Sequence, residues 1–386
     1  MPLKRKFCFR GVLHLVSGVS SRCENGNFEG FFLWILEKSA LEWYNTGIDT
    51  GGKIVIREYA VGEESYLEVE TGEWKGRMIL SVGSILLELT EKKTGLNLLR
   101  SPETIEDLKF QPEVYGFPVL IPPNCIHKGL FSWRGRNYHL PVNNPFGNHI
   151  HGVVLNRKWH LADSGEENGA VWVESSYTYN EENEMFEGFP HEFRVDLRYT
   201  FLPDRVLQRL TVTNIGPETM PLGVGFHSTF RFPLGDRSPE AYRSSSVRVT
   251  TADFYWKFDR EKRFAITGEK ARWNRYDDFR HGKIINREPV SKQCPVAEDW
   301  IDGKSFRGAI LDFPVPRIKV VYRWDEKFGQ AALWNREGME DFFCAEPMSW
   351  MADSPNLPLP ESVTGLYPLE PGEVWSAENT ISVERY

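Results

Sequence analysis

A histidine at position 227 lies in a segment of glycine and aromatic residues that suits a buried polar group. The segment from Pro221 to Pro233 reads PLGVGFHSTFRFP. Its glycines allow close approach of the backbone, and its phenylalanines provide apolar surroundings. A histidine in apolar company is more often a hydrogen-bonded core residue than a functional one. His227 therefore becomes a candidate only when other segments supply partners for it.

Two other segments supply such partners. Residues 148–152 read NHIHG and offer the imidazoles of His149 and His151, and Glu346 follows a strand-like apolar run. An acid and a base held apart by a rigid scaffold are what proton transfer on a neutral substrate requires. Together with His227, these residues indicate acid–base chemistry.

The pair His149 and His151 also invites a metal interpretation, because residues i and i+2 of a strand share a face. A site of the cupin type would have a glutamate four or five residues further on, where this chain has Leu155 and Asn156. Without a nearby carboxylate or cysteine ligand we expect no metal. His149 is left out of the site, as a surface or supporting residue.

The chain has no G-x-S-x-G elbow and no Walker or dinucleotide-binding glycine pattern. Serine hydrolysis, ATP-dependent chemistry and hydride transfer therefore lose support, and we expect no cofactor. Imidazoles, carboxylates, asparagine and aromatic rings remain. Asparagine both donates and accepts hydrogen bonds, which suits vicinal hydroxyls, and aromatic rings pack on the C–H faces of sugars. This set fits a neutral, polyhydroxylated ligand.

Strands must position these residues, because period-two alternation dominates from about residue 66. The run from Phe193 to Phe201 alternates apolar and polar residues, and Ile318, Val320, Tyr322 and Trp324 lie on one parity. Turn residues punctuate such runs, and helical patterns are scarce: we expect short helices only at 31–44 and around 103–108. These patterns predict an all-β fold, a large antiparallel β-sandwich with few short helices.

Residues 1–65 differ in character from the rest of the chain. They contain a basic head, a patch rich in glycine, serine and asparagine, and the pair Gly51 and Gly52. We interpret 1–65 as a partly ordered N-terminal extension and 66–386 as the β-sandwich domain. All-β sandwiches often run long as one unit, so length alone does not divide this region.

Composition argues against a nucleic-acid partner and predicts a cytoplasmic protein. The formal charge is −8 and the pI is near 5.7, which argue against a nucleic-acid partner. The cysteines are odd in number, scattered and without a C-x-x-C pair, as expected of reduced thiols. Residues 2–16 faintly mimic a signal peptide, but Arg10 and His14 interrupt their apolar part. Residues 31–36 are too few to span a bilayer. We expect a monomer or homodimer without a membrane partner.

The order of several motifs resembles the aldose 1-epimerase (galactose mutarotase) family. Residues 116–126, GFPVLIPPNCI, resemble the family segment G-x-P-x-L-x-P-x-N-R-I, and His151-Gly152 followed by Trp159 resembles its H-G … W segment. The segment around His227 and its approach, then Glu346-Pro347 and the L-E-P-G-E run at 369–373, follow in the family's order. The resemblance covers roughly residues 66–386.

The resemblance implies a supersandwich fold and the interconversion of α and β anomers of a free aldose, such as a hexose, without cofactor or metal. His227 would be the general acid at the ring oxygen and Glu346 the general base at the anomeric hydroxyl. His151 and Asn124 would bind the sugar. For the family's substrate-binding aspartate, Asp299 is the best match and Asp302 is nearly as good. The partner is thus a small monosaccharide.

One departure from the family is Cys125, where the family usually has arginine after the asparagine. A thiol is a weak donor, whereas a guanidinium offers five donors and a charge. Either another basic residue (Lys128, Arg157 or Arg231) fills the space, or the preferred sugar differs. A sugar-binding protein that has lost catalysis is an alternative function. A glycoside hydrolase or lyase using Glu346 and an aspartate is another, and it would not need His227.

Overall fold

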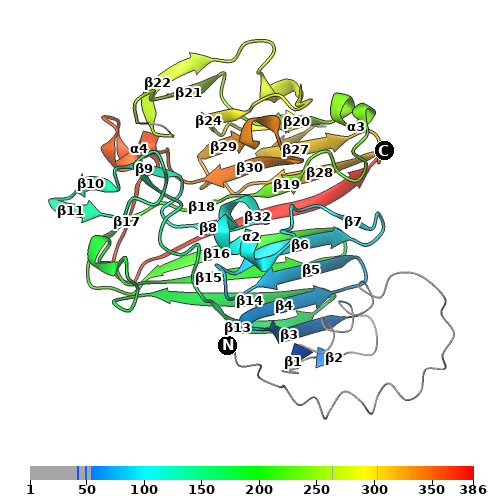
Figure 1. Ribbon diagram of the computed structural model, residues 1–386, viewed down its shortest axis with the longest axis horizontal. Helices are drawn as coiled ribbons and strands as arrows, with labels where there is room; N and C mark the ends of the chain where they lie inside the picture. The colour runs from blue at the N-terminus through cyan, green and yellow to red at the C-terminus, as the bar shows by residue number, and fades with distance from the viewer. Residues whose placement is uncertain (1–40, 43–47, 50–53, 263, 302) are drawn as a thin grey trace, which may run out of the picture. The chain divides into compact units, whose positions relative to one another are not determined.

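The computed structural model describes residues 41–42, 48–49, 54–262, 264–301 and 303–386 (Figure 1). Three features of the sequence therefore lie outside the described residues: most of the expected helix at 31–44, the signal-like segment at 2–16, and Asp302. In the described part of the chain, no helix is long and apolar enough to cross a membrane.

A first antiparallel sheet is built from the N-terminal strands. Its spatial order is β3-β4-β5-β6-β7, with β2 against β3. The bounds are β1 (Leu41–Glu42), β2 (Ile48–Asp49), β3 (Val55–Val61), β4 (Glu64–Glu70), β5 (Trp74–Ile79), β6 (Ile85–Glu91) and β7 (Leu96–Asn97). Because β3 pairs along its whole length with β4, the sheet includes residues before position 66, which the sequence had placed in the extension.

A second sheet runs β13-β14-β15-β16-β32-β28-β27-β20-β23. Its long strand β32 lies between β16 and β28 and divides the sheet into two halves, one with β13, β14, β15 and β16 and the other with β28, β27, β20 and β23 (Figure 1). The bounds are β13 (His160–Glu167), β14 (Ala170–Tyr179), β15 (Phe193–Phe201), β16 (Arg205–Asn214), β20 (Ser246–Val249), β23 (Lys283–Ile284), β27 (Gly308–Phe313), β28 (Ile318–Arg323) and β32 (Val374–Arg385).

A third sheet carries Glu346 on β30, and His227 lies between two of its strands, β18 and β19. Its order is β22-β21-β24-β29-β30-β18-β8, and β19 also pairs with β30. The bounds are β8 (Val119–Leu120), β18 (Gly225–Phe226), β19 (Thr229–Arg231), β21 (Phe254–Phe258), β22 (Ile266–Arg272), β24 (Ser291–Pro295), β29 (Gln330–Trp334) and β30 (Phe342–Met348).

Short two-stranded pairs and short helices complete the described fold. The pairs are β9 (Cys125–His127) with β12 (Asn148–Ile150), β10 (Leu130–Trp133) with β11 (Arg136–His139), β17 (Met220–Leu222) with β31 (Tyr367–Leu369), and β25 (Asp299–Ile301) with β26 (Lys304–Phe306). The helices are α2 (Ile105–Phe110), α3 (Pro239–Ser244), α4 (Glu361–Thr364) and the 3₁₀ turns η1 (Pro112–Val114), η2 (Phe186–Gly188), η3 (Phe279–His281), η4 (Arg336–Gly338) and η5 (Ser354–Asn356).

The first and third sheets pack on opposite halves of the second sheet. On one half, the indole Nε1 of Trp74 donates to the carbonyl of Leu202 at 2.9 Å. On the other half, the ring of Phe230 packs against Tyr322 with centroids 5.7 Å apart. One continuous buried apolar cluster runs through both halves. The result is an antiparallel sandwich, which confirms the predicted fold class.

The predicted strand from Phe193 to Phe201 is confirmed as β15, with the apolar residues buried at alternate positions. The short helix predicted around 103–108 is α2, which begins after the N-cap Thr104. Its hydroxyl accepts from the backbone of Asp107, and the Asp107 carboxylate accepts in return from the backbone of Thr104.

Candidate active site

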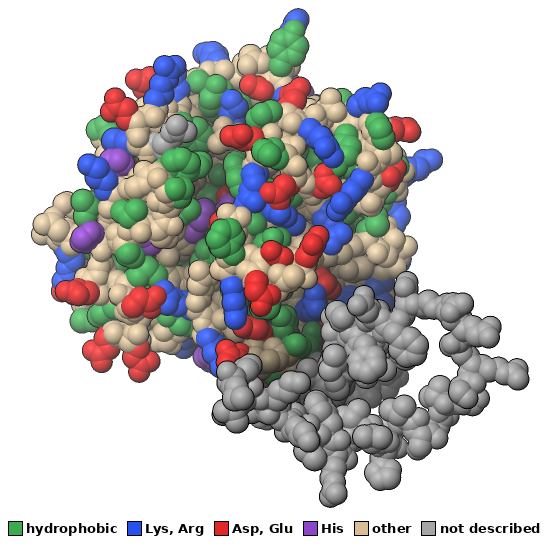
Figure 2. Space-filling view, viewed as in Figure 1, with side chains coloured by type: hydrophobic (Ala, Val, Ile, Leu, Met, Phe, Trp, Pro, Cys, Tyr) green, Lys and Arg blue, Asp and Glu red, His purple; other side chains and the backbone are tan. Residues whose placement is uncertain are grey.

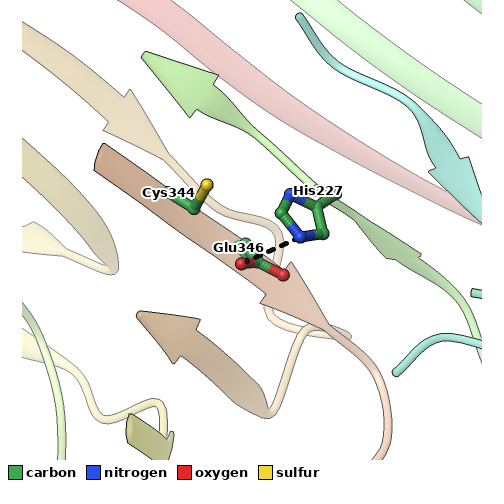
Figure 3. Close-up of side chains that lie close together, drawn as sticks. All are labelled: His227, Cys344 and Glu346. Carbon is green, nitrogen blue, oxygen red and sulfur yellow. Dashed lines mark ion pairs between the residues drawn. The ribbon is translucent and has the colours of Figure 1, made fainter. Parts of the chain in front are cut away.

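His227 and Glu346 are brought together by strand pairing. His227 lies between β18 and β19, and both strands pair with β30, which carries Glu346. Gly225 stands opposite Met348, and Thr229 stands opposite Cys344. His227 and Glu346 each lie midway between these paired positions and therefore face each other. Figure 3 shows the imidazole of His227 directed at the Glu346 carboxylate.

The contact between the two groups is direct. Nε2 of His227 lies 3.6 Å from Oε1 of Glu346, and the two side chains are only 6% and 4% exposed. On the face drawn in Figure 2, by contrast, basic and acidic side chains are interspersed at the surface. Titratable groups that are buried against a specific charge partner are candidates for a functional site.

His151 lies beside this pair. Its ring centroid is 5.2 Å from that of His227, edge to face, and its Nδ1 is buried without a hydrogen-bond partner among the described residues. Its backbone is left-handed, with φ of 66°, and it is followed by Gly152 at φ of 75°. A Cβ on Gly152 would lie 2.1 Å from the carbonyl oxygen of Ile121. Glycine is therefore required next to His151.

Asn124 is held between the segment of His151 and the strand of Glu346. Its backbone carbonyl accepts from the amide of His151 at 2.9 Å, and its Nδ2 lies 3.5 Å from the sulfur of Met348. Met348 is two residues from Glu346 on β30, so it shares the face of that carboxylate. The structure thus brings Asn124, His151, His227 and Glu346 into one neighbourhood.

Asp299 is not part of that neighbourhood in its described contacts. Its carboxylate accepts from Nη2 of Arg248 at 2.7 Å and from the backbone of Trp300 at 2.8 Å. These bonds hold the pKa of Asp299 below its ordinary value, the Trp300 amide contributing most. Asp299 as a sugar ligand stays a prediction of the resemblance.

Burial decides where protons reside in the pair. It raises the pKa of Glu346 well above the ordinary value of 4.5. Burial also lowers the pKa of His227 well below 6.5, with further lowering by the neighbouring His151 and the charge of Arg336. Burial lowers the pKa of His151 to about 3. Burial therefore favours the uncharged form of each group: the carboxylic acid of Glu346 and the neutral imidazoles of His227 and His151.

Thr229 contacts the far side of the His227 ring. Its hydroxyl oxygen lies 3.5 Å from Nδ1 of His227, 3.2 Å from the carbonyl oxygen of His227 and 3.4 Å from the sulfur of Cys344. A hydroxyl that donates to the carbonyl can accept from Nδ1–H. This pattern leaves the lone pair of Nε2 facing the protonated Glu346. The sequence analysis did not single out Thr229, although it lies in the segment of His227.

Two residues at the end of the strand β29 were also missed. The indole of Trp334 lies edge-on to the His227 ring at 5.8 Å, and the guanidinium of Arg336 lies 5.6 Å from the Trp334 ring centre. Arg336 also contacts Glu340 and Gln111 at 2.7 and 2.8 Å. No motif marks either residue, because only the pairing of β29 with β30 brings them near the site.

None of the three basic residues suggested as replacements for the family arginine bonds to the pair. Arg157 binds Glu184 at 2.6 Å, Arg231 donates to the carbonyl of Leu99 at 2.8 Å, and the side chain of Lys128 is exposed. Cys125 itself is 0% exposed and belongs to a small apolar cluster with Trp256, Met351 and Ala352. Burial raises the pKa of its thiol to about 12.

Among the described residues, one group has donor atoms close enough for a metal ion. Donor atoms of His227, Cys344 and Glu346 all lie within 4.8 Å of one another. These ligand types suit zinc, but burial raises the pKa of Cys344 well above 9, so metal binding there would have to displace a proton. His149, the other histidine considered as a ligand, is engaged elsewhere: its Nδ1 is hydrogen-bonded to the carbonyl of Pro141 at 2.8 Å.

The fold and the arrangement of these side chains define a β-sandwich protein with a buried acid–base pair. The chain belongs to the aldose 1-epimerase family, which residues 77–382 match. A galactose mutarotase-like protein from Clostridium acetobutylicum is 30% identical, with a TM-score of 0.82 over 87% of this chain and 100% of that one. A galactose 1-epimerase from Lactobacillus acidophilus is 15% identical, with a TM-score of 0.67 over 86% of this chain and 99% of that one. The uncharacterized protein YphB of Escherichia coli is 24% identical over 284 residues, 69% of this chain and 83% of its own length.

Proposed function

We propose that this protein interconverts the α and β anomers of a free aldose by acid–base ring opening. The observation that supports it most is the buried contact between His227 and Glu346, an imidazole and a carboxyl group 3.6 Å apart. Both oxygens that exchange protons in this reaction are attached to C1 of the sugar. A proton donor and a proton acceptor in direct contact can reach such a pair of oxygens at once.

The protons balance over the reaction. Ring opening requires His227 to carry the shared proton and Glu346 to be ionised, a state with the same number of protons as the resting pair. His227 then gives its proton to the ring oxygen while Glu346 takes the proton of the anomeric hydroxyl. The bond between C1 and the ring oxygen breaks, and an open aldehyde with a free hydroxyl forms. After rotation about C1–C2 the aldehyde recloses with the roles reversed, and the pair regains its starting protons.

The surrounding residues bind the sugar in this proposal. His151 and Asn124 offer unshared nitrogen donors or acceptors beside the pair, and the partly buried Trp334 offers an apolar edge next to His227. Asp299 enters only through the resemblance, because its carboxylate is bonded to Arg248. Cys125 is assigned no sugar contact in this proposal, because it packs in an apolar cluster with Trp256, Met351 and Ala352.

The two alternatives differ from this proposal in their chemical requirements. A two-carboxylate hydrolase needs a second acid about 5–9.5 Å from Glu346 and has no need of a histidine there, whereas the titratable group in contact with Glu346 is the imidazole of His227. A sugar-binding protein without catalysis would bind the same ligands at a site of the same geometry, so only a rate measurement separates it. We further propose a cytoplasmic monomer or homodimer that acts in carbohydrate metabolism without a nucleic-acid or membrane partner.

Polarimetry on freshly dissolved α-aldoses tests the proposal directly. The purified protein should accelerate the approach to anomeric equilibrium for at least one hexose or pentose, and prior dialysis against EDTA should leave that rate unchanged. A protein that loses activity with EDTA and regains it with zinc would contradict the metal-free mechanism. Sugar binding without any acceleration across the panel would favour the non-catalytic alternative.

A further inference from the structure

Gln293 on β24 is a fully buried glutamine that uses only half of its amide. Its Oε1 accepts from the backbone amide of Ala352 at 2.9 Å. Its Nε2 has no hydrogen-bond partner among the described residues, and the residue is 0% exposed. The bond from Ala352 fixes which end of the amide is the oxygen, because a backbone N–H must meet an acceptor. A buried N–H donor is therefore available at a known position.

Strand register places this donor on the face of the sheet that carries Glu346. Gln293 stands directly opposite Ala332 on β29, and Ala332 stands directly opposite Glu346 on β30. Residues opposite each other on antiparallel strands project from the same face. Gln293, Ala332 and Glu346 thus form a row across three strands, which spans about 10 Å because neighbouring strands are about 4.8 Å apart.

The middle of this row is small and its two ends are polar. Ala332 contributes a single methyl group and is 9% exposed, more than either Gln293 or Glu346. Trp334 lies two residues further along β29 on the same face and meets the His227 ring. A pyranose ring on the methyl of Ala332, with C1 at the pair of His227 and Glu346, directs its opposite edge toward Gln293.

We propose that Gln293 is a sugar-binding residue that donates its Nε2–H to a hydroxyl oxygen at C3 or C4, across the ring from the anomeric carbon. The proposal rests on the function proposed above and adds a contact that favours sugars with a hydroxyl there. Because Oε1 is already occupied, Gln293 acts only as a donor, and the ligand must supply the acceptor.

The orientation of Gln293 depends on the segment after β30. Ala352 packs in the small apolar cluster with Cys125 and Met351, and the next backbone amide, that of Asp353, donates to the carbonyl of Cys125 at 2.6 Å. The same segment thus links β9 to the chain that carries Glu346 and also holds the Gln293 amide. The donor is positioned before the sugar arrives, which limits the entropy lost on binding.

A ligand cycle tests the contact by binding rather than by activity. Dissociation constants are measured by ligand-observed NMR for the preferred aldose and its 3-deoxy and 4-deoxy analogues, with the wild type, Gln293→Met and Gln293→Glu. A neutral hydrogen bond is worth about three- to tenfold in affinity. We expect one deoxy analogue to bind the wild type more weakly by that factor, and Gln293→Met to bind the parent sugar and that analogue equally.

Gln208→Met is the matched control. Gln208 is a fully buried glutamine on β16 in the second sheet, and its amide bonds to the hydroxyls of Tyr199 and Tyr322 at 2.9 and 2.8 Å. The control removes a buried amide outside the row of Gln293, Ala332 and Glu346, and it should keep the discrimination between parent and analogue. Melting curves for all variants show which are folded. Gln293→Glu keeps an acceptor for Ala352 and loses the donor only when the new carboxyl group is ionised, so it should resemble Gln293→Met at the alkaline end of the measured pH range.

The outcomes separate this inference from the proposed function. Equal discrimination by wild type and Gln293→Met, or a wild type that binds none of the sugars, overturns the role of Gln293. A wild type that binds sugars but does not speed mutarotation overturns the proposed function, and the dissociation constants still test the role of Gln293. If Gln293→Met fails to fold, Gln293→Glu and the two deoxy analogues on the wild type decide the matter.

Discussion

The imidazole of His227 and the carboxylate of Glu346 face each other across paired strands, with Nε2 3.6 Å from Oε1 and both groups buried. Such proximity couples their titrations, so apparent pKa values belong to the pair. Burial raises the pKa of Glu346 and lowers that of His227, so it favours the uncharged form of each group. This distribution has consequences that kinetics can detect.

Glu346→Gln and His227→Asn should each lower kcat by about a hundred- to ten-thousandfold while changing KM little, since each removes a proton-transfer group and keeps a polar side chain. The acid and alkaline limbs of the pH profile of kcat/KM should also change. Activity requires the pair to hold one titratable proton in total. It therefore falls at low pH, where His227 and Glu346 are both protonated, and at high pH, where Glu346 is ionised and His227 is neutral. We expect Glu346→Gln to remove the alkaline limb and His227→Asn the acid limb.

The opposite assignment of the limbs would show that ionised Glu346 and protonated His227 are already the resting state. A Glu346→Gln rate within a few fold of the wild type would identify another residue as the base. The double variant should lose less than the product of the two single losses, because acid and base act in one coupled step.

Thr229→Val removes the hydroxyl beside Nδ1 of His227 at nearly constant volume. We expect kcat to fall by about three- to tenfold, the value of one hydrogen bond, with little change in KM. Because the oxygen that accepts from Nδ1–H also stabilises a protonated ring, the acid limb should move to lower pH. Thr229→Ser should restore both properties. A Thr229→Val profile that overlays the wild type would show that the hydroxyl serves only Cys344 or the backbone.

Gly152→Ala should lower both stability and sugar turnover, because the new Cβ would meet the Ile121 carbonyl at 2.1 Å and shift His151. Gly147 provides the control, since it also has a positive φ, of 77°, with no atom within 4 Å of its added Cβ. Gly147→Ala should cost about 1–2 kcal/mol in the free energy of unfolding, from backbone strain alone. Urea unfolding and polarimetry compare the two variants; equal losses would mean that contact with Ile121 does not matter.

Cys125→Arg should destabilise the protein by several kcal/mol instead of changing its sugar preference, because the side chain is fully buried in an apolar cluster. The sequence suggested that Cys125 marks altered specificity. Cys125→Ala should cost much less, because it removes a small apolar group without adding charge. A folded Cys125→Arg protein with a changed ranking of sugars in thermal melts and polarimetry would restore the specificity interpretation.

Acid should destabilise the fold in part through His191. Burial, with a smaller effect of the Arg136 charge, lowers the pKa of His191 to about 4, and its Nε2 is 2.9 Å from the hydroxyl of Tyr138. A lowered pKa in the folded state means that stability present above pH 6.5 is lost as pH falls toward 4. His191→Gln should remove about 2 kcal/mol of the decrease in unfolding free energy between pH 7 and pH 4.5. Urea titrations at the two pH values measure it, and an unchanged decrease would contradict the assignment.

The sequence predicted the strands better than it predicted the site. Alternation of apolar and polar residues identified β15 and β28, because their side chains divide between core and surface. The motifs around His151, His227 and Glu346 found groups that the structure then places together. All three lie in segments whose local composition is unusual, which is why a single chain was sufficient to find them.

The missed contacts depend on pairing between distant strands. Nothing near Gln293 or Trp334 in the sequence signals a site, and their roles follow from the register of β24, β29 and β30. Asp299 was chosen as the best match for the family's substrate-binding aspartate, but its bond to Arg248 on β20 required the fold to be known. The burial of Cys125 was equally invisible, because an isolated cysteine is found in cores and in sites alike.

The long sequence separation between His227 and Glu346 also constrains how the protein acquires its function. β30 is synthesised late and pairs with β18 and β19, which are synthesised much earlier. The nascent chain therefore carries His227 for a long stretch of translation before any carboxylate partner exists, and contacts of this range form slowly in refolding. Recovery of sugar turnover after dilution from denaturant should consequently lag behind the return of bulk strand signal, and turnover would report the moment when β30 pairs with β18 and β19.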